Sequence, residues 1–322
     1  MVYNIIKGKG DVMPAYSTHY LFAYELMEKI KSNVDFALDE QAVYIGTQGP
    51  DIFYDHRILP WMCGKSLRKV GSVLHRARPS VQFDALRDYV NQHPDDDIAK
   101  SYAVGFILHY ALDRVCHPYV YFMQYRFKEL YPDIHTFTAH NMAEFALDSY
   151  LLFKKLGVQN PASFDTSKTL NYTDLTRTHC AKIISFFVSN STENFVSQFD
   201  AEQAIDDLKY IQKVTFDPND KICKVLKPAE IFASSFTKNF KPSSMFRVDD
   251  MQYAAKFANN RHGIWYSPYN KSVARNESFA DLFENAKPEA IFMIQGFFEN
   301  TDTFELTGDL SFLTGERVKY EA

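Results

Sequence analysis

Apolar residues along this chain recur three and four positions apart, which is the period of one face of an α-helix. The first such segment is predicted to begin at Ser17 or Thr18, either of which can cap a helix, and its apolar positions continue to Ile30. Further helices are predicted over residues 35–46, 65–76 and 81–92, over a central helix that follows caps at 95–97 and continues beyond Pro118 to 130, and over 138–155.

In the second half of the chain the helical period returns over residues 173–189, 202–213, 227–240 and 249–259. A turn-rich connector is expected at 261–268, a capping serine at 278, and a last helix from Pro288 to about residue 300. No stretch alternates apolar and polar residues for long enough to make a sheet, and no internal repeat is present. The chain is therefore predicted to be all-α.

The organisation predicted along the chain has four parts. Residues 1–12 have the pattern of an irregular lead-in, and residues 301–322 that of an irregular tail. Residues 13–160 are expected to form a metal-binding helical core, for the reasons given below, and 161–300 to add packing helices to the same domain. A chain of 322 residues can bury a large core without requiring two domains.

Composition narrows the class of partner. Glycine (12) and proline (13) are few, which argues against a linker-rich or disordered protein. The aromatic share of 16% mainly supplies bulky side chains for the core. A net charge of -5 gives no basic footprint for a nucleic-acid backbone, and lysine and arginine form no run of the kind that binds anionic membranes.

The sequence also bears on the cellular compartment. The four cysteines lie far apart and form no Cys-x-x-Cys pair, so neither a disulfide framework nor a thiolate zinc site is predicted. The first ten residues lack the apolar stretch of a signal peptide, and no apolar run has the length needed to span a bilayer. We therefore expect a cytoplasmic protein with no transmembrane segment. Its oligomeric state is not indicated.

Three side chains suited to metals stand at four-residue steps in the apolar stretch 105–118: His109, Asp113 and His117. Residues four apart in a helix lie one turn above each other, so the three form a single stripe. Burying such groups without partners costs several kcal/mol, and imidazole and carboxylate together suit zinc. The stripe therefore predicts a divalent metal.

A second four-residue step follows at His140 and Glu144, inside the helix predicted over 138–155. Two such steps on neighbouring helices can face each other across a helical core, as carboxylate and histidine sites do in bundles. We therefore predict that the two helices turn these side chains toward each other around bound cations.

Three other residues are ambiguous from their local sequence. His19 would lie in the first turn of a helix, where a histidine is more often a surface or cap residue than a ligand. His75 has the position of a helix-terminal histidine. Asp51 follows a Gly-Pro turn, where it could cap the next helix or point into a cleft, and both alternatives remain open.

Taken in order, these motifs resemble those of a known family. They are Thr18-His19-Tyr20, Gln48-Gly-Pro-Asp51, Gly71-Ser-Val-Leu-His75, His109-x3-Asp113-x3-His117-Pro118, His140-x3-Glu144 and the late Trp265-x2-Pro268 and Ser278-Phe279. Their ordered combination resembles the zinc-dependent phospholipase C family, well in the first half of the chain and loosely in the second. The resemblance implies a single multi-helix domain of the phospholipase C/P1 nuclease type.

The resemblance also implies a cluster of two or three zinc ions. By motif, His75, His109 and Asp113 would hold one zinc, and His19 with a bridging Asp113 a second. His117, His140 and Glu144 would bind a third, and Asp51 would act as the general base or as an added ligand near the attacking water. Secreted members also use an N-terminal tryptophan. Here no tryptophan precedes His19, so that site is weak, empty or completed by water.

Three functions compete at this stage. The first is hydrolysis of a phosphodiester, either a phospholipid head group or another small molecule, by a phospholipase C-like enzyme. The second is a single-strand-specific nuclease of the same fold, which would want a basic groove and is disfavoured by the acidic balance. The third is a non-catalytic binding protein in which metal ions only staple a helical core.

Overall fold

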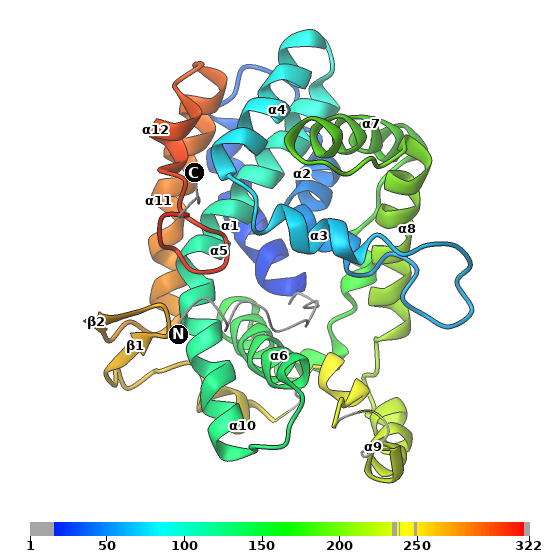
Figure 1. The fold of residues 1–322 in the computed structure, drawn as a ribbon, viewed down its shortest axis with the longest axis vertical. Helices are drawn as coiled ribbons and strands as arrows, with labels where there is room; N and C mark the ends of the chain where they lie inside the picture. The colour runs from blue at the N-terminus through cyan, green and yellow to red at the C-terminus, as the bar shows by residue number, and fades with distance from the viewer. Residues whose placement is uncertain (1–15, 234–236, 238, 248–249, 319–322) are drawn as a thin grey trace. The chain divides into compact units, whose positions relative to one another are not determined.

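The computed structural model describes residues 16–233, 237, 239–247 and 250–318, and its regular structure is almost entirely helical (Figure 1). The α-helices are α1 Tyr16–Lys31, α2 Glu40–Gly46, α3 Arg68–Leu74, α4 Pro79–Gln92, α5 Asp97–Leu130, α6 Thr136–Leu156, α7 Asp174–Ser191, α8 Gln198–Val214, α9 Lys221–Ala233, α10 Met251–Ala255, α11 Phe279–Phe298 and α12 Thr303–Thr307. Short 3-10 helices are η2 Gly49–Phe53, η3 Pro161–Ser163, η4 Thr166–Thr169 and η5 Pro242–Met245. The prediction of an all-α fold is confirmed. The expected lead-in, 1–12, lies outside the described residues.

The described chain forms two compact units, each assembled from three segments. Unit 1 takes its residues from 16–18, 116–166 and 212–282. Unit 2 takes its residues from 19–115, 167–211 and 283–318. The predicted division of the chain at residue 160 stays a prediction.

The core of unit 2 is built on the first half of α5. Its residues Tyr102, Phe106 and Tyr110 are fully buried, as are the residues between them, because neighbouring helices cover all sides. The backbone of α2 approaches closest: a Cβ atom added at Gly105 would lie 2.3 Å from the Val43 carbonyl oxygen, which no real side chain tolerates. This contact fixes the end of α2, and with it the η2 turn that follows.

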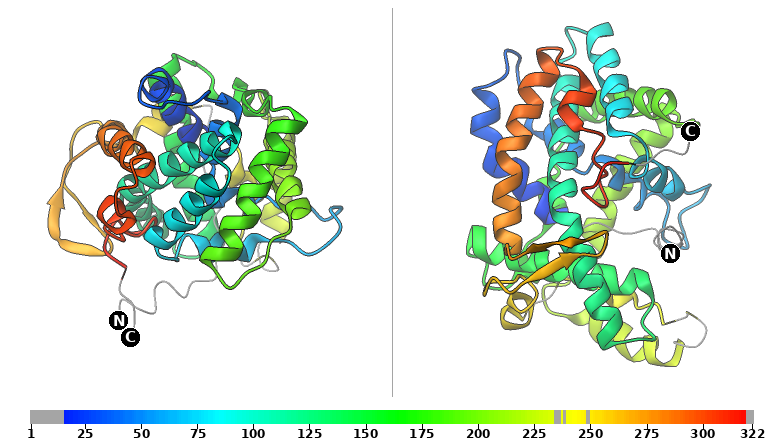
Figure 2. Two further views of the ribbon diagram at one scale, coloured as in Figure 1. Left: turned by 90° about the horizontal axis from the view of Figure 1, so that it is seen from above. Right: turned by 60° about the vertical axis from the view of Figure 1, so that its left-hand side comes forward.

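Other helices of unit 2 pack around this core. α11 lies alongside α1 (Figure 2), where the rings of Phe22 and Phe283 meet edge to face at 5.3 Å. The ammonium group of Lys287 donates to the Glu25 carboxylate across the same contact. α4 packs against both α7 and α12. The contacts with α11 hold α1 in a defined position, and α3, which packs against η2, is held by that turn.

Unit 1 is organised around α6, which packs against α10 and η5. The buried carboxylate of Asp148 on α6 accepts hydrogen bonds from the backbone N–H of Thr18 at 2.6 Å and from the guanidinium of Arg247 at 3.0 Å. Arg247 also donates to the Ser17 hydroxyl at 2.7 Å. Ser17 and Thr18, expected as caps, lie inside the first turn of α1, and Asp148 satisfies that turn instead.

One segment differs from the sequence-based expectation. Where only a turn-rich connector was expected, β1 Trp265–Ser267 and β2 Asn270–Arg275 form a two-stranded antiparallel hairpin. Strand β2 is mostly exposed, so it shows no alternation of apolar and polar residues that could have revealed it. Trp265 is buried and its ring meets that of Tyr119 at 5.0 Å, which anchors the hairpin to α5 within unit 1.

The two largest differences in helix boundaries are those of α9 and α11. α9 was expected at 227–240 but begins at Lys221, because the Asp217 carboxylate accepts from three backbone N–H groups of its first turn. The last long helix was expected to open at Pro288, but α11 runs from Phe279 through that proline. Pro288 lies on the exposed side, where water can satisfy the carbonyl group that loses its partner. The tail, expected to be irregular, contains the short helix α12.

Among the described helices, none combines the length and apolarity needed to cross a membrane. All four cysteines are free thiols; three are buried and Cys63 is exposed.

Candidate metal centres

Five of the predicted ligands meet inside unit 2, and together they are called the unit 2 centre. They are His19 on α1, Asp51 in η2, His75 directly after α3, and His109 and Asp113 on α5. Each is buried, with at most 6% of its surface exposed. Four separate elements therefore deliver three imidazoles and two carboxylates to one enclosed point.

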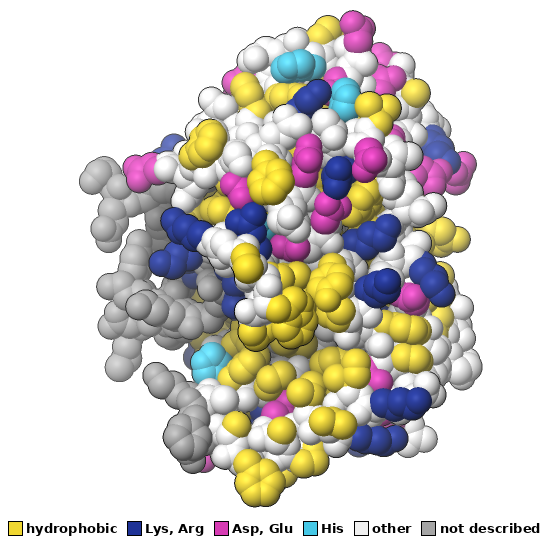
Figure 3. Space-filling model, turned by 90° about the vertical axis from the view of Figure 1, so that its right-hand side faces the viewer, with side chains coloured by type: hydrophobic (Ala, Val, Ile, Leu, Met, Phe, Trp, Pro, Cys, Tyr) yellow, Lys and Arg dark blue, Asp and Glu magenta, His cyan; other side chains and the backbone are white. Residues whose placement is uncertain are grey.

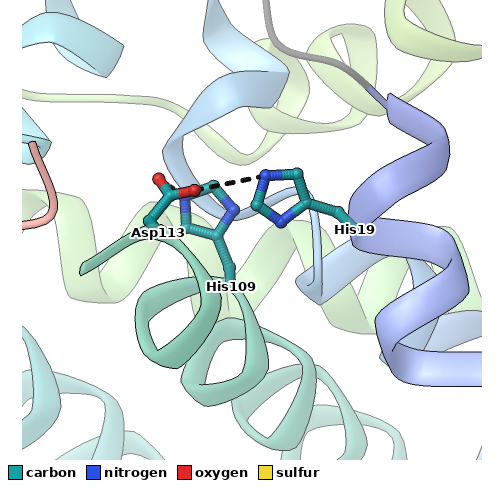
Figure 4. Close-up of side chains that lie close together, drawn as sticks. All are labelled: His19, His109 and Asp113. Carbon is teal, nitrogen blue, oxygen red and sulfur yellow. Dashed lines mark ion pairs between the residues drawn. The ribbon is translucent and has the colours of Figure 1, made fainter. Parts of the chain in front are cut away.

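Asp113 lies between two sets of histidines. Its Oδ1 atom is 3.3 Å from His19 Nε2 (Figure 4). Its Oδ2 atom is 3.1 Å from His109 Nε2 and 3.7 Å from His75 Nε2. The two oxygens of one carboxylate thus face different histidines.

Asp51 points into the same centre. Its Oδ1 atom is 3.1 Å from His75 Nε2, and its Oδ2 atom is 4.0 Å from His19 Nε2. Of the two alternatives left open by the sequence, the structure therefore favours a side chain that points inward over a helix cap. The same residue can reach either side of the centre.

The histidines are oriented by the backbone. His75 Nδ1 donates to the Gly71 carbonyl at 2.8 Å, and His109 Nδ1 donates to the Thr47 carbonyl at 3.2 Å. A carbonyl oxygen can only accept, so each Nδ1 carries a hydrogen, and Nε2 is the ring atom that faces the carboxylates and is left to bind a metal. Such outer hydrogen bonds fix the tautomer and the ring plane of histidine ligands in metal sites.

Gly49 makes this packing possible. Its φ angle is +50°, in the left-handed region, and an added Cβ atom would lie 2.5 Å from ring atoms of His109. Any side chain would therefore clash with the imidazole and strain the backbone as well. The Gly-Pro step before Asp51 is thus part of the wall of the centre.

The charges of the centre affect its protonation. Burial lowers the pKa of His75, but the neighbouring carboxylates of Asp51 and Asp113 outweigh it and raise the pKa to about 10. Burial also lowers the pKa of His109, and there the same two carboxylates do not compensate fully. In the metal-free protein a proton on His75 therefore partly neutralises the two acids.

The remaining predicted ligands meet in unit 1, and this group is called the unit 1 centre. It consists of His117 on α5 with His140 and Glu144 on α6, all buried. Glu144 Oε1 is 3.0 Å from His140 Nε2 and 3.6 Å from His117 Nε2. Burial raises the pKa of Glu144, but the two histidines outweigh burial and leave it below its usual value.

His140 has an outer partner of its own. Its Nδ1 atom lies 2.8 Å from the Oε1 atom of buried Gln124, which can accept that hydrogen. The ring of Tyr121 stands edge-on to His140 at 5.1 Å, and that of Tyr269 edge-on to Tyr121 at 5.4 Å. The unit 1 centre thus has an oriented histidine and an aromatic wall.

Both centres contain buried polar atoms without hydrogen-bond partners, which a divalent metal would satisfy. Among the described residues, His109 Nε2, His140 Nε2 and Glu144 Oε2 are buried and have no hydrogen-bond partner. Buried polar atoms are rarely left so. The donor atoms lie within 4.8 Å of one another in each of three sets, and imidazole and carboxylate donors are the set that zinc accepts. The sets are His19, His109 and Asp113; Asp51, His75 and His109; and His117, His140 and Glu144.

Comparison with known proteins agrees with this donor set. A family model described as zinc dependent phospholipase C matches residues 18–205, which is more than half of the chain. The chain belongs to the zinc-dependent phospholipase C family. The match contains all eight predicted site residues. No curated protein and no solved structure matches the chain.

The family resemblance seen in the motifs is thus confirmed, and the structure shows how the motifs group. His109 and Asp113 group with His19 and His75, which local sequence favoured as surface, cap or helix-end residues, and with Asp51, for which a cap and a cleft position had both stayed open. His117 groups with His140 and Glu144 of the second stripe.

Sequence reasoning missed the outer partners. The carbonyl groups of Thr47 and Gly71 carry no side-chain signal, so nothing in the sequence distinguishes them. Gln124 did carry one: it follows His117 by seven residues on the same helix, and positions seven apart share a face. A polar amide on the ligand-bearing face of an otherwise apolar helix is typical of a second-layer partner.

Proposed function

We propose that this member of the zinc-dependent phospholipase C family hydrolyses phosphodiesters, with a phospholipid head group or another small phosphodiester as substrate. The position of Asp113 carries the proposal, because its two oxygens face His19 on one side and His75 with His109 on the other. A carboxylate shared between histidines can hold two metal ions close together, as two-metal hydrolysis needs.

We assign the ligands as follows. His75, His109 and Asp113 would hold one zinc, and His19 with Asp113 a second. A third would be held by His117, His140 and Glu144 in the unit 1 centre. Zinc ions bound in such sites acidify a water molecule and neutralise the charge of a phosphate group.

Asp51 has the geometry of the general base. Its carboxylate reaches both sides of the unit 2 centre, so it can accept a proton from a water molecule held there. The water oxygen forms a bond to phosphorus, the bond from phosphorus to the leaving oxygen breaks, and the departing alkoxide takes a proton from solvent. The outer carbonyls of Gly71 and Thr47 keep the imidazoles aimed throughout.

We also propose a cytoplasmic location. The four free thiols support it, because cysteines persist unpaired in reducing compartments. Fractionation of cells that express a tagged protein would test it, and recovery outside the cytoplasm would contradict it.

The test of function combines metal analysis with two substrates. We expect the purified protein to contain zinc by elemental analysis and to hydrolyse a chromogenic choline phosphodiester but not single-stranded DNA. Cleavage of the DNA alone would assign the protein to the nuclease activity. Bound zinc without turnover of either substrate would contradict the phospholipase assignment and leave the metal site standing.

A further inference from the structure

Helix α9 in unit 1 exposes an apolar face. Val225 is 73% exposed and Phe232 is 87% exposed, and Ile222 is 38% exposed on the same side. The three follow one another by three and seven residues, which places them on one face of the helix. Figure 3 looks onto the side that carries α9 in Figure 1 and shows hydrophobic side chains open to the surface in its lower part.

The opposite side of α9 is held to the protein. Cys223 is buried, and the Glu230 carboxylate accepts from the backbone N–H and the hydroxyl group of Ser243 at 2.5 and 2.8 Å. The helix is therefore fixed in its orientation, with the apolar side chains outward. A fixed apolar face of this kind marks a surface that another body covers.

The charges beside this face are positive. Lys221, Lys224 and Lys227 are all exposed and recur every three residues, so they form no run in the sequence and only the helix brings them to one side. Three acids lie nearby: the Asp217 carboxylate caps the first turn of α9, Asp220 pairs with Lys227 at 3.7 Å, and Glu230 accepts from Ser243 on the inward side. The outward charges that remain are those of Lys221 and Lys224. A partner that complements α9 therefore offers an apolar region to the exposed apolar side chains and negative groups to the lysines beside them.

We propose that α9 is an interfacial helix that docks the protein on a bilayer containing anionic lipids. The apolar face would enter the head-group region, and the three lysines would meet lipid phosphates at its edge. A second copy fits less well, because a two-fold contact through α9 would bring lysines of both copies together. The inference goes beyond the proposed hydrolysis, since docking requires no turnover.

Vesicle flotation tests the proposal with the full chain. Wild-type protein should float with vesicles of phosphatidylcholine plus phosphatidylserine, and much less with phosphatidylcholine alone. The double variant Val225→Ser, Phe232→Ser should lower the bound fraction about tenfold. The pair Lys224→Glu, Lys227→Glu should abolish the preference for phosphatidylserine. Phe292→Ser provides the matched control, because Phe292 is 59% exposed on α11 in unit 2 and should leave flotation unchanged.

The outcomes separate docking from catalysis. The serine double variant should hydrolyse the soluble choline phosphodiester as fast as wild type does and should unfold at the same temperature, because both side chains are exposed. Failure of the wild type to float, flotation of the double variant equal to wild type, or a wild-type dimer that the double variant dissociates would each overturn the proposal. Flotation without hydrolysis would contradict the proposed function and leave the docking proposal standing.

Discussion

Two roles were predicted for Asp113 by different routes: that of a metal ligand by its spacing, and that of a bridge between two zinc ions by the family resemblance. Its spacing from His109 and His117 predicted a metal ligand, because a helix fixes the geometry of residues four apart. His19 and His75 gave no such signal, since each stands alone on its own element. Their approach to Asp113 depends on how α1 and α3 pack on α5, which no local pattern contains.

The substitution Asp113→Asn tests the proposed bridging role of this side chain. The amide keeps the shape of the side chain but removes the charge shared between the two histidine sets, so we expect bound zinc to be lost and hydrolysis to fall at least about 100-fold. Elemental analysis and the chromogenic assay measure the two effects. Asp174→Asn is the control, because that carboxylate lies on the surface of α7 and is 96% exposed. Full metal content in the Asp113 variant would contradict a bridging role.

Among the elements, the long helices with a strong apolar period were predicted well, and short or exposed elements were not. α4 and α6 lie within two residues of their predicted bounds, because their buried faces repeat over several turns. The hairpin at Trp265 was missed because its second strand has no buried face. The start of α9 was missed because its cap, Asp217, lies ten residues ahead of the first predicted residue.

The η2 turn supports a prediction for Gly49→Ala. The new methyl group would meet the His109 ring and the backbone would keep a left-handed φ, so we expect a loss of about 1–3 kcal/mol in unfolding free energy and weaker zinc binding. Gly157→Ala isolates the backbone part, because Gly157 has a φ of +67° but no atom within 4 Å of an added Cβ. Denaturant unfolding and competition with a zinc chelator measure both. Equal losses of unfolding free energy in the two variants, with zinc affinity intact, would show that the close packing of Gly49 on His109 does not shape the centre.

For the whole molecule, the period of the apolar residues was enough to predict an all-α fold, but it could not predict the two units. Each unit joins three stretches that are far apart in the chain, such as 116–166 with 212–282. The grouping of the eight ligands follows from that assembly. The family motifs implied a grouping in advance because they summarise packing that single-chain periodicity does not record.

The stability of the metal-free molecule should depend on pH through His75. Its pKa is about 10 in the folded state, against about 6.5 for a free imidazole. A raised pKa means that the stabilisation is fully present below pH 6.5 and is lost as the pH rises toward 10. We therefore expect chelator-treated protein to lose a few kcal/mol of unfolding free energy between pH 6.5 and 9, measured by urea unfolding.

Zinc-loaded protein should be less sensitive over the same range, because the cation replaces the proton. His75→Gln should abolish the decline in the metal-free protein. A flat profile for chelator-treated wild type would show that His75 carries no such proton.

The hydrogen-bond acceptors that orient the histidine rings differ between the two centres. In the unit 2 centre the orienting acceptors belong to the main chain at Thr47 and Gly71, and no change of side chain can delete a peptide oxygen. In the unit 1 centre the acceptor is the amide of Gln124, which a single codon change removes. Single substitutions can therefore change the orientation of His140 in the unit 1 centre. In the unit 2 centre the histidines lose their acceptors only if the backbone itself changes its conformation.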